Sequence, residues 1–304
     1  MPAVSTDVLA RFNSSSLITG IAGYSVANEG SQHVIVGTSA SNGDTLTELY
    51  WKPGQGVKQD VLTTFDVAMA PGGGYYVAEE DTQHVIVWTR VGDIVEVYWK
   101  SGQGVKQDIL TSFTSVGGFA GFVGYYAPNE GTQHAIVGTI DAPINPTVGI
   151  VSELYWKSGQ GVKQDELARF HGSISVLGAY YVAGEDTQHA IVITPEGNLT
   201  ELYWKSGQGV KQDVLLPQAG RRAGTAFYSA DDQRQHVVLI RDDGTLTDVH
   251  WQSGQGIHQD VLTQLSSPVT SNDMKVAGYY SANDQRRHVI VATRNDGTVS
   301  EVYW

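Results

Sequence analysis

The sequence of 304 residues contains no cysteine, and no run approaches the ~20 apolar residues that cross a membrane. The absence of cysteine means that no disulfide holds the fold together. The opening stretch, MPAVSTDVLARF, lacks the basic start and the apolar core of a signal peptide. We therefore expect a soluble protein without membrane insertion, which is either cytoplasmic or secreted by another route.

Basic residues are also scarce, with 19 lysines and arginines against 32 acidic residues and a net charge of −13. Such a balance repels nucleic acid and anionic membranes at long range, and no basic stripe interleaved with aromatic residues is present. The sequence has no linker, low-complexity tract or charge block. We therefore expect one domain over residues 1–304 and no nucleic-acid partner.

Repetition is what the sequence has in abundance. The phrase QHVIV, or a close relative, occurs six times, with its histidines about 50 residues apart. These histidines are His33, His84, His134, His189, His236 and His288. A period of this length without a helical pattern is typical of propeller blades.

Each unit divides into four short extended runs. In the copy that spans residues 178–215 these runs begin at Gly178, His189, Leu199 and Val210. The first is rich in aromatic and small residues, as expected of an innermost strand, and PEGN at Pro195 supplies a tight hairpin turn. The sequence therefore predicts an all-β fold, a six-bladed β-propeller with four antiparallel strands per blade.

The two ends of the chain complement each other. The last residues, EVYW at 301–304, correspond to the end of a third strand, and the outer strand of that unit does not follow them. The segment TDVLARF at 6–12 matches QDVLTTF at 59–65 and QDELARF at 164–170. We therefore predict that the N-terminal strand completes the last blade and closes the ring, which removes free sheet edges.

One loop is almost unchanged among the units. SGQGVKQD stands at 101–108, 158–165 and 206–213, whereas the connections between units, such as those at 63–73 and 216–226, share little. Surface loops of duplicated units usually drift fastest. The retained loop therefore either grips the neighbouring blade or lines a repeated pocket.

The same rim gathers residue types that suit carbohydrate. Each unit brings its histidine, an acid near the end of the third strand and a tryptophan three residues later. The acids are Glu48, Glu96, Glu153, Glu201, Asp248 and Glu301, and the tryptophans are Trp51, Trp99, Trp156, Trp204, Trp251 and Trp304. An indole takes the apolar face of a sugar, while carboxylate and imidazole groups bind its hydroxyls.

The segment HVVLIRDDGTLTD at 236–248 and its sisters resemble the repeats of the six-bladed Aleuria-type fucose-binding lectins of fungi and bacteria. In that family an arginine of strand two and a glutamate of strand three, twelve residues apart across a hairpin, hold the sugar. The acid here stands twelve residues after His84, His189 and His236. The resemblance implies a multivalent lectin with glycan partners, for which a homo-oligomer is possible. Histidine replaces the family's arginine in every unit, so the histidine either contacts the sugar or bonds the acid of its own repeat.

Other chemistries find less support in the sequence. The repeated histidines are too far apart to share one metal ion, so we expect no metal and no cofactor. No nucleophile elbow or phosphate loop is visible, and His171, His250 and His258 fall at unrelated repeat positions, so we expect no enzyme. The alternative to a lectin is a structural or protein-interaction propeller, in which the repeated loops pack blades or dock a partner.

Overall fold

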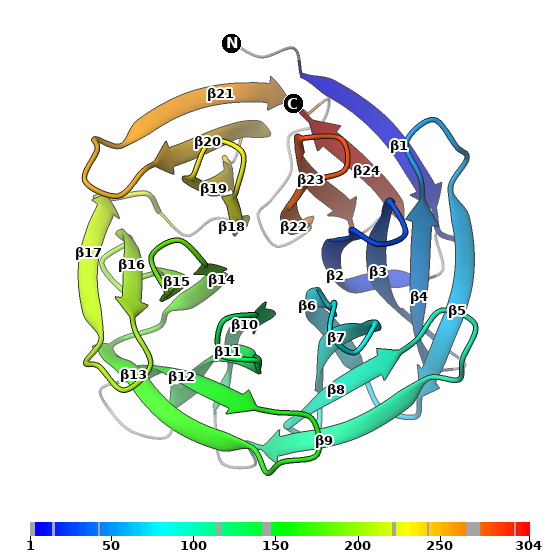
Figure 1. Cartoon of the computed structure of the whole chain (residues 1–304), viewed down its shortest axis with the longest axis horizontal. Coiled ribbons are helices and arrows are strands. Elements are labelled where there is room, and N and C mark those ends of the chain that lie inside the picture. The colour runs from blue at the N-terminus through cyan, green and yellow to red at the C-terminus, as the bar shows by residue number, and fades with distance from the viewer. Residues whose placement is uncertain are drawn as a thin grey trace.

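The computed structural model describes residues 4–13, 16–41, 43–113, 117–141, 147–220, 223–241, 243–265, 274–294 and 296–304. Their strands form six blades of four antiparallel strands around a central axis, and one parallel pairing joins two neighbouring blades into an eight-stranded sheet (Figure 1). The predicted six-bladed β-propeller is therefore confirmed. Within these ranges no helix is long and apolar enough to span a membrane.

The blades follow one another along the chain, each from its innermost to its outermost strand. Blade 1 consists of β2 (Leu17–Val26), β3 (Ser31–Ala40), β4 (Gly43–Trp51) and β5 (Lys58–Phe65). Blade 2 consists of β6 (Met69–Val77), β7 (Thr82–Thr89), β8 (Asp93–Trp99) and β9 (Lys106–Ser112). Blade 3 consists of β10 (Gly118–Ala127), β11 (Thr132–Asp141), β12 (Val148–Trp156) and β13 (Lys163–His171). Blade 4 consists of β14 (Ser175–Val182), β15 (Thr187–Ile193), β16 (Leu199–Trp204) and β17 (Lys211–Leu216).

The last two blades complete the ring. Blade 5 consists of β18 (Gly224–Ser229), β19 (Arg234–Ile240), β20 (Thr245–Trp251) and β21 (His258–Gln264). Blade 6 consists of β22 (Met274–Ser281), β23 (Arg286–Thr293), β24 (Thr298–Tyr303) and, as its outer strand, β1 (Ser5–Arg11).

Small residues let the innermost strands approach one another around the axis. A Cβ atom added at Gly73 of β6 would lie 1.9 Å from the backbone nitrogen of Gly124 in β10. One added at Gly178 of β14 would lie 2.5 Å from the nitrogen of Ala226, where β14 and β18 share a parallel pairing. The small residues of the first run in each unit are therefore required by the close packing at the centre of the ring.

The hydrophobic core lies between neighbouring blades. The second strand of each blade is buried on both faces, so its apolar residues run on without alternation. Ile86 of β7, for example, is fully buried in a cluster with Val137 of β11 and Leu154 of β12. Each blade thus packs its apolar residues against its neighbours, and a closed ring gives every blade two of them.

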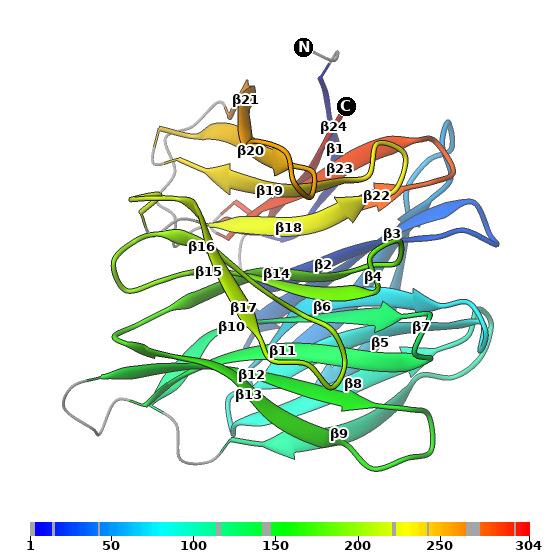
Figure 2. The same ribbon diagram turned by 60° about the vertical axis from the view of Figure 1, so that its left-hand side comes forward.

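The ring is closed by the two ends of the chain. Strand β1 pairs antiparallel with β24, in a register that sets Asp7 opposite Glu301. The hydroxyl of Tyr303 donates to Asp7 Oδ2 across 3.1 Å, and Arg11 Nη1 donates to the hydroxyl of Thr298 across 3.0 Å. Figure 2 shows β1 lying along β24 near both termini. The predicted closure is therefore confirmed.

Candidate functional site

The repeated histidine is buried and bonded within its own blade. His189 is 3% exposed, its Nδ1 donates to Glu201 Oε1 across 2.8 Å, and its Nε2 lies 2.7 Å from the hydroxyl of Thr187. The same histidine–acid bond joins His33 to Glu48, His84 to Glu96, His134 to Glu153, His236 to Asp248 and His288 to Glu301. Of the two roles open to the histidine, this geometry favours the internal bond to its own acid.

Aromatic rings hold each histidine in place. The ring of His189 is stacked between Tyr180, at 5.2 Å, and Tyr203, at 6.0 Å, and Lys211 Nζ lies over the Tyr203 ring. Burial, followed by the charge of Glu201, raises the pKa of Tyr180 well above its ordinary value. This tyrosine therefore stays protonated and remains a hydrogen-bond donor.

The hydroxyl of that inner tyrosine reaches the next blade. A hydrogen bond of 2.8 Å joins Tyr180 to the side-chain amide of Gln235, and Gln235 is the residue that precedes the histidine of blade 5. Equivalent bonds run from Tyr24 to Gln83, Tyr75 to Gln133, Tyr125 to Gln188 and Tyr279 to Gln32. Because the Tyr75 hydroxyl also lies 3.0 Å from Glu96 Oε1, the acid of one blade lies at the junction with the next.

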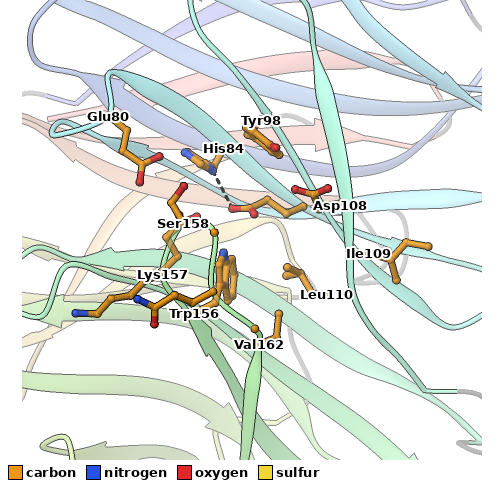
Figure 3. Close-up of a pocket in the computed structure, with 15 residues that line it drawn as sticks. Glu80, His84, Tyr98, Asp108, Ile109, Leu110, Trp156, Lys157, Ser158 and Val162 are labelled. Atoms are coloured by element: carbon orange, nitrogen blue, oxygen red, sulfur yellow. Dashed lines mark hydrogen bonds and ion pairs between the residues drawn. The ribbon is translucent and has the colours of Figure 1, made fainter.

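A cavity of about 500 Å³ opens at the junction of blades 2 and 3. Blade 2 contributes Glu96, His84 and Asp108 to its wall, while blade 3 contributes Trp156 and the loop 158–162 (Figure 3). Two arrangements could bring such an acid and tryptophan into one pocket, a blade junction at which the acid of one blade meets an indole, or a twist at the strand end. In this cavity the acid and the tryptophan come from neighbouring blades. Because residues three apart on one strand point to opposite faces of the sheet, the acid and the tryptophan of one blade face different junctions.

The junction of blades 3 and 4 repeats the arrangement in a cavity of about 520 Å³. Glu153 and Asp165 of blade 3 face Trp204 and the loop 206–210 of blade 4. At both junctions the retained SGQG loop lines a cavity together with residues of the neighbouring blade.

Among the described residues, the indole N–H groups in these two cavities have no hydrogen-bond partner. Trp156 and Trp204 are each 5% exposed, and their Nε1 atoms are buried. At the second junction the amide of Gln188 is occupied at both ends, since it accepts from Tyr125 across 2.7 Å and donates to Glu130 across 3.1 Å. A buried donor without an acceptor costs about 1–3 kcal/mol, so an oxygen atom of a ligand would be favoured there.

Corresponding residues stand at three further junctions. The acid of one blade and the tryptophan of the next are Glu48 with Trp99, Glu201 with Trp251, and Glu301 with Trp51. At the junction of blades 4 and 5 the amide of Gln235, turned to satisfy its neighbours, accepts from the Trp251 indole at 3.3 Å and donates to Glu201 at 2.7 Å. Five junctions therefore carry the acid, the tryptophan and the SGQG-type loop.

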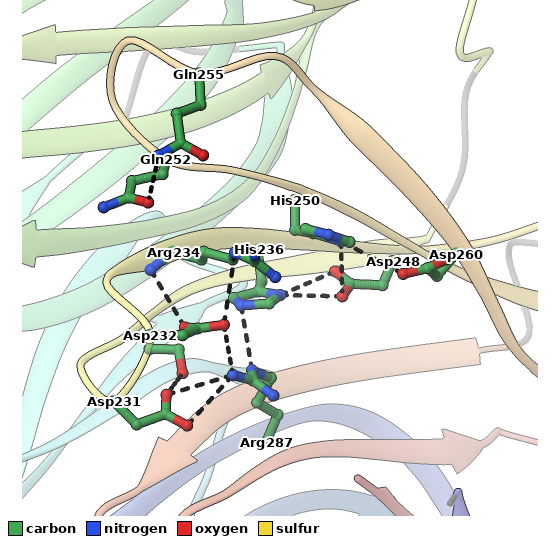
Figure 4. A network of polar contacts seen from close by, with 11 residues as sticks. Asp231, Asp232, Arg234, His236, Asp248, His250, Gln252, Gln255, Asp260 and Arg287 are labelled. Atoms are coloured by element: carbon green, nitrogen blue, oxygen red, sulfur yellow. Dashed lines mark hydrogen bonds and ion pairs between the residues drawn. The ribbon is translucent and has the colours of Figure 1, made fainter. Parts of the chain in front are cut away.

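The junction of blades 5 and 6, where Asp248 and Trp304 stand, is built differently. Its outer strand β1 does not follow β24 in the chain, so no SGQG loop joins the two. Arg287 replaces the usual glutamine, and its Nε donates to His236 Nε2 across 3.2 Å (Figure 4). Arg287 Nη2 also donates to Asp232 across 2.7 Å. We therefore do not count this junction among the equivalent cavities.

His250 and His258, which the sequence analysis considered unrelated, lie together in blade 5. They are cross-strand partners with ring centroids 5.6 Å apart, and they stand where the other blades have tyrosine and lysine. With His236 and Asp248, His250 forms a buried group of the kind that metals use. However, the donation from Arg287 to Nε2 places the hydrogen of His236 on Nδ1, which then lacks a lone pair for a metal. We interpret the group as a stack of rings in which His236 bonds Asp248, while His250 Nδ1 lies 3.4 Å from the same carboxylate.

Three residues that line the cavity between blades 2 and 3 were not among the residues predicted from the sequence. Glu80 comes from the turn before the second strand, Gln133 from the residue before the histidine, and Asp108 from the start of the outer strand. The signal was present, because an acid occurs in each of those turns and QD ends the retained loop phrase in five units. These residues become neighbours only when two blades pack together.

No protein-family model and no curated protein matches the chain. Among solved structures, AofleA from Arthrobotrys oligospora is 13% identical, with a TM-score of 0.69 over 99% of this chain and 86% of its own. A mutant of the Aleuria aurantia lectin bound to Fucalpha1-6GlcNAc is 15% identical, with a TM-score of 0.69 over 97% and 93%. The Trypanosoma rangeli sialidase is 10% identical, with a TM-score of 0.61 over 100% and 60%. The resemblance to Aleuria-type lectins is therefore confirmed for the fold.

We expect Glu201→Gln to lower the free energy of unfolding by about 1–3 kcal/mol, because the buried bond from His189 loses its charged acceptor. Chemical denaturation of the variant measures this loss. Glu196→Gln is the control, since Glu196 is an exposed acid in the same blade and its replacement should change stability by less than about 0.5 kcal/mol. A Glu201→Gln variant as stable as the parent would contradict the scaffold role of this carboxylate.

Proposed function

We propose that this protein is a carbohydrate-binding protein, a multivalent lectin whose sites are the cavities at the blade junctions. The observation that carries the proposal is the pairing of an acid from one blade with a buried, unpartnered indole N–H from the next. Glycans or glycoconjugates are then the partners, bound without a cofactor. The tryptophans and acids of these junctions are the proposed contacts, and the histidines hold the acids in place through hydrogen bonds.

The chemistry of a cavity fits a sugar ring. The Trp156 N–H can donate to a hydroxyl oxygen, and the carboxylate of Glu96 can accept from a hydroxyl hydrogen on the same ligand. Ile109, which is 65% exposed, lines the outer wall and offers an apolar surface to the C–H groups of a sugar. A cavity of about 500 Å³ lies in the usual range for small-molecule sites.

The solved neighbours support the general class of ligand. One Aleuria aurantia lectin structure is described as having a six-bladed β-propeller fold and a novel fucose recognition mode, and SapL1 lectin was solved with alpha methyl fucoside. The chain departs from that family at the arginine, where it has a histidine whose nitrogens are engaged by Thr and Glu side chains. The proposal therefore covers carbohydrate binding and does not extend to fucose.

The competing functions have weaker support. In a structural or protein-interaction propeller the SGQG loops would pack blades or dock a partner, whereas at two junctions they line cavities. The likeness to the sialidase raises the question of catalysis. We propose a protein that is not an enzyme, because the polar groups repeat from junction to junction, whereas a propeller enzyme works through one unsymmetric site at the axis.

The test removes single indole N–H groups. We expect Trp204→Phe to reduce the number of sugar molecules bound per protein by one, and a double variant with Trp156→Phe by two, in equilibrium titration against the best ligand of a glycan array. Trp88→Phe is the matched control, because the Trp88 N–H is also buried without a partner but lies outside both cavities. Unchanged stoichiometry in the double variant, or the absence of any ligand on the array, would overturn the proposal.

A further inference from the structure

The cavity between blades 3 and 4 is strongly acidic. Four carboxylates line it, from Glu130, Glu153, Asp165 and Glu166, and the residues lining it include no lysine or arginine. Cations close by offset part of this charge, since Arg169 pairs with Glu166 at 2.7 Å and Lys163 lies over the ring of Tyr155, which also lines the cavity. Lys205 stands between Trp204 and Ser206 in the chain. A ligand in this cavity therefore meets an excess of negative charge.

The histidine of this cavity offers no free nitrogen to a ligand. His134 Nδ1 donates to Glu153 across 2.8 Å, and Nε2 lies 2.6 Å from the hydroxyl of Thr132, so neither nitrogen is free to bind an anion. The Trp204 N–H remains the one buried donor without a partner among the described residues of this cavity. The cavity thus offers one donor for a hydroxyl oxygen and several acceptors for hydrogens that carry positive charge.

Resting on the proposed function, we infer that this cavity binds a sugar with a free amino group, as its ammonium ion, and rejects sulfated or carboxylated sugars. A hydroxyl of such an amino sugar accepts from Trp204 and donates to Glu153. The ammonium group lies among Glu130, Asp165 and Glu166. Opposite charges attract and like charges repel most strongly where water is partly excluded, so both preferences have the same cause.

The cavity between blades 2 and 3 serves as an internal comparison for the charge of this cavity. At the junction of blades 2 and 3 the position of Glu166 is taken by Ile109, and Lys157 lines the cavity. That cavity is therefore less negative, and its preference for an amino sugar is expected to be smaller. The substitution Glu166→Ile gives the cavity between blades 3 and 4 the residue that stands at this position between blades 2 and 3. Glu166 is exposed, so little effect on folding is expected.

The experiment reads the cavity through its own tryptophan. The indole N–H resonance of Trp204, assigned as the signal that Trp204→Phe removes, is followed by NMR while glucosamine and galactosamine are added. Their N-acetylated and 6-sulfated counterparts serve as matched probes. We expect a free amino sugar to shift this resonance at a concentration at least ~10-fold below that of its N-acetylated form, and the sulfated sugar to leave it unmoved. The preference should shrink in high salt and in Glu166→Ile.

The outcomes separate this inference from the proposed function. If N-acetylated or sulfated sugars shift the Trp204 resonance as readily as the free amines, charge selection is overturned while carbohydrate binding stands. If none of these sugars, and no ligand from a glycan array, shifts any indole resonance, both fail. Retention of the full preference in a Glu130→Gln and Asp165→Asn double variant would also overturn the inference.

Discussion

Deletion of residues 1–12, which removes β1, is expected to lower the free energy of unfolding by at least about 3 kcal/mol. The deletion removes the antiparallel ladder between β1 and β24 and the packing of Leu9 and Phe12 against the core between blades 6 and 1. It also leaves β24 as a free edge with unpaired backbone groups, so the shortened protein should aggregate more readily. Thermal and chemical denaturation of the deletion variant measure the loss.

A matched control separates closure of the ring from a mere change in surface. Val8 lies on β1 and is 54% exposed, so Val8→Lys should keep the strand paired and change stability by less than about 0.5 kcal/mol. A deletion variant that unfolds at the same denaturant concentration as the full chain would show that β1 does not close the ring.

Display of the sugar on a surface is expected to raise the apparent affinity by ~10² or more over the same sugar free in solution. The cause is that five junctions of one rigid ring carry corresponding residues, so a second and third contact form without a new encounter in solution. The two affinities are compared by surface binding to a glycan-coated layer and by calorimetry with the monosaccharide.

Removing sites should reduce this gain stepwise. Trp156→Phe and Trp204→Phe together leave fewer cavities to engage the surface, so dissociation from the coated layer should accelerate, while Trp88→Phe should dissociate like the parent. Equal affinity for free and displayed sugar would contradict the multivalent arrangement, even if each cavity binds.

Sequence alone was sufficient for the architecture because the information it needed is local. Hairpin turns, aromatic and β-branched runs and small residues such as those from Gly178 on recur in every unit, so each unit predicted the same four strands. The closure by residues 6–12 could also be predicted, because the last unit lacks an outer strand and residues 6–12 match the outer strands of other units. Because the same pattern occurs in six units, an ambiguous residue in one unit does not change the predicted fold.

The types of residue at the candidate site were likewise visible in the sequence, but their partners were not. Alternation along one strand indicated only that Glu153 and Trp156 point to opposite faces. The rotation between blades then decided that Glu153 faces Trp204 and that Trp156 faces Glu96. These neighbours are 51 and 60 residues apart, and no local rule of spacing connects them.

Tertiary structure also decided what the odd residues do. His250 and His258 occupy unrelated positions in the repeat, yet strand pairing places them side by side. Packing of blade 6 likewise brings Arg287 into hydrogen-bonding contact with His236. Sequence by itself therefore determined the fold, the number of blades and the closure, since these follow from the pleat and the turns. Only packing decided that the histidines are buried and that acids pair with tryptophans across junctions, since each of these depends on the neighbouring blade.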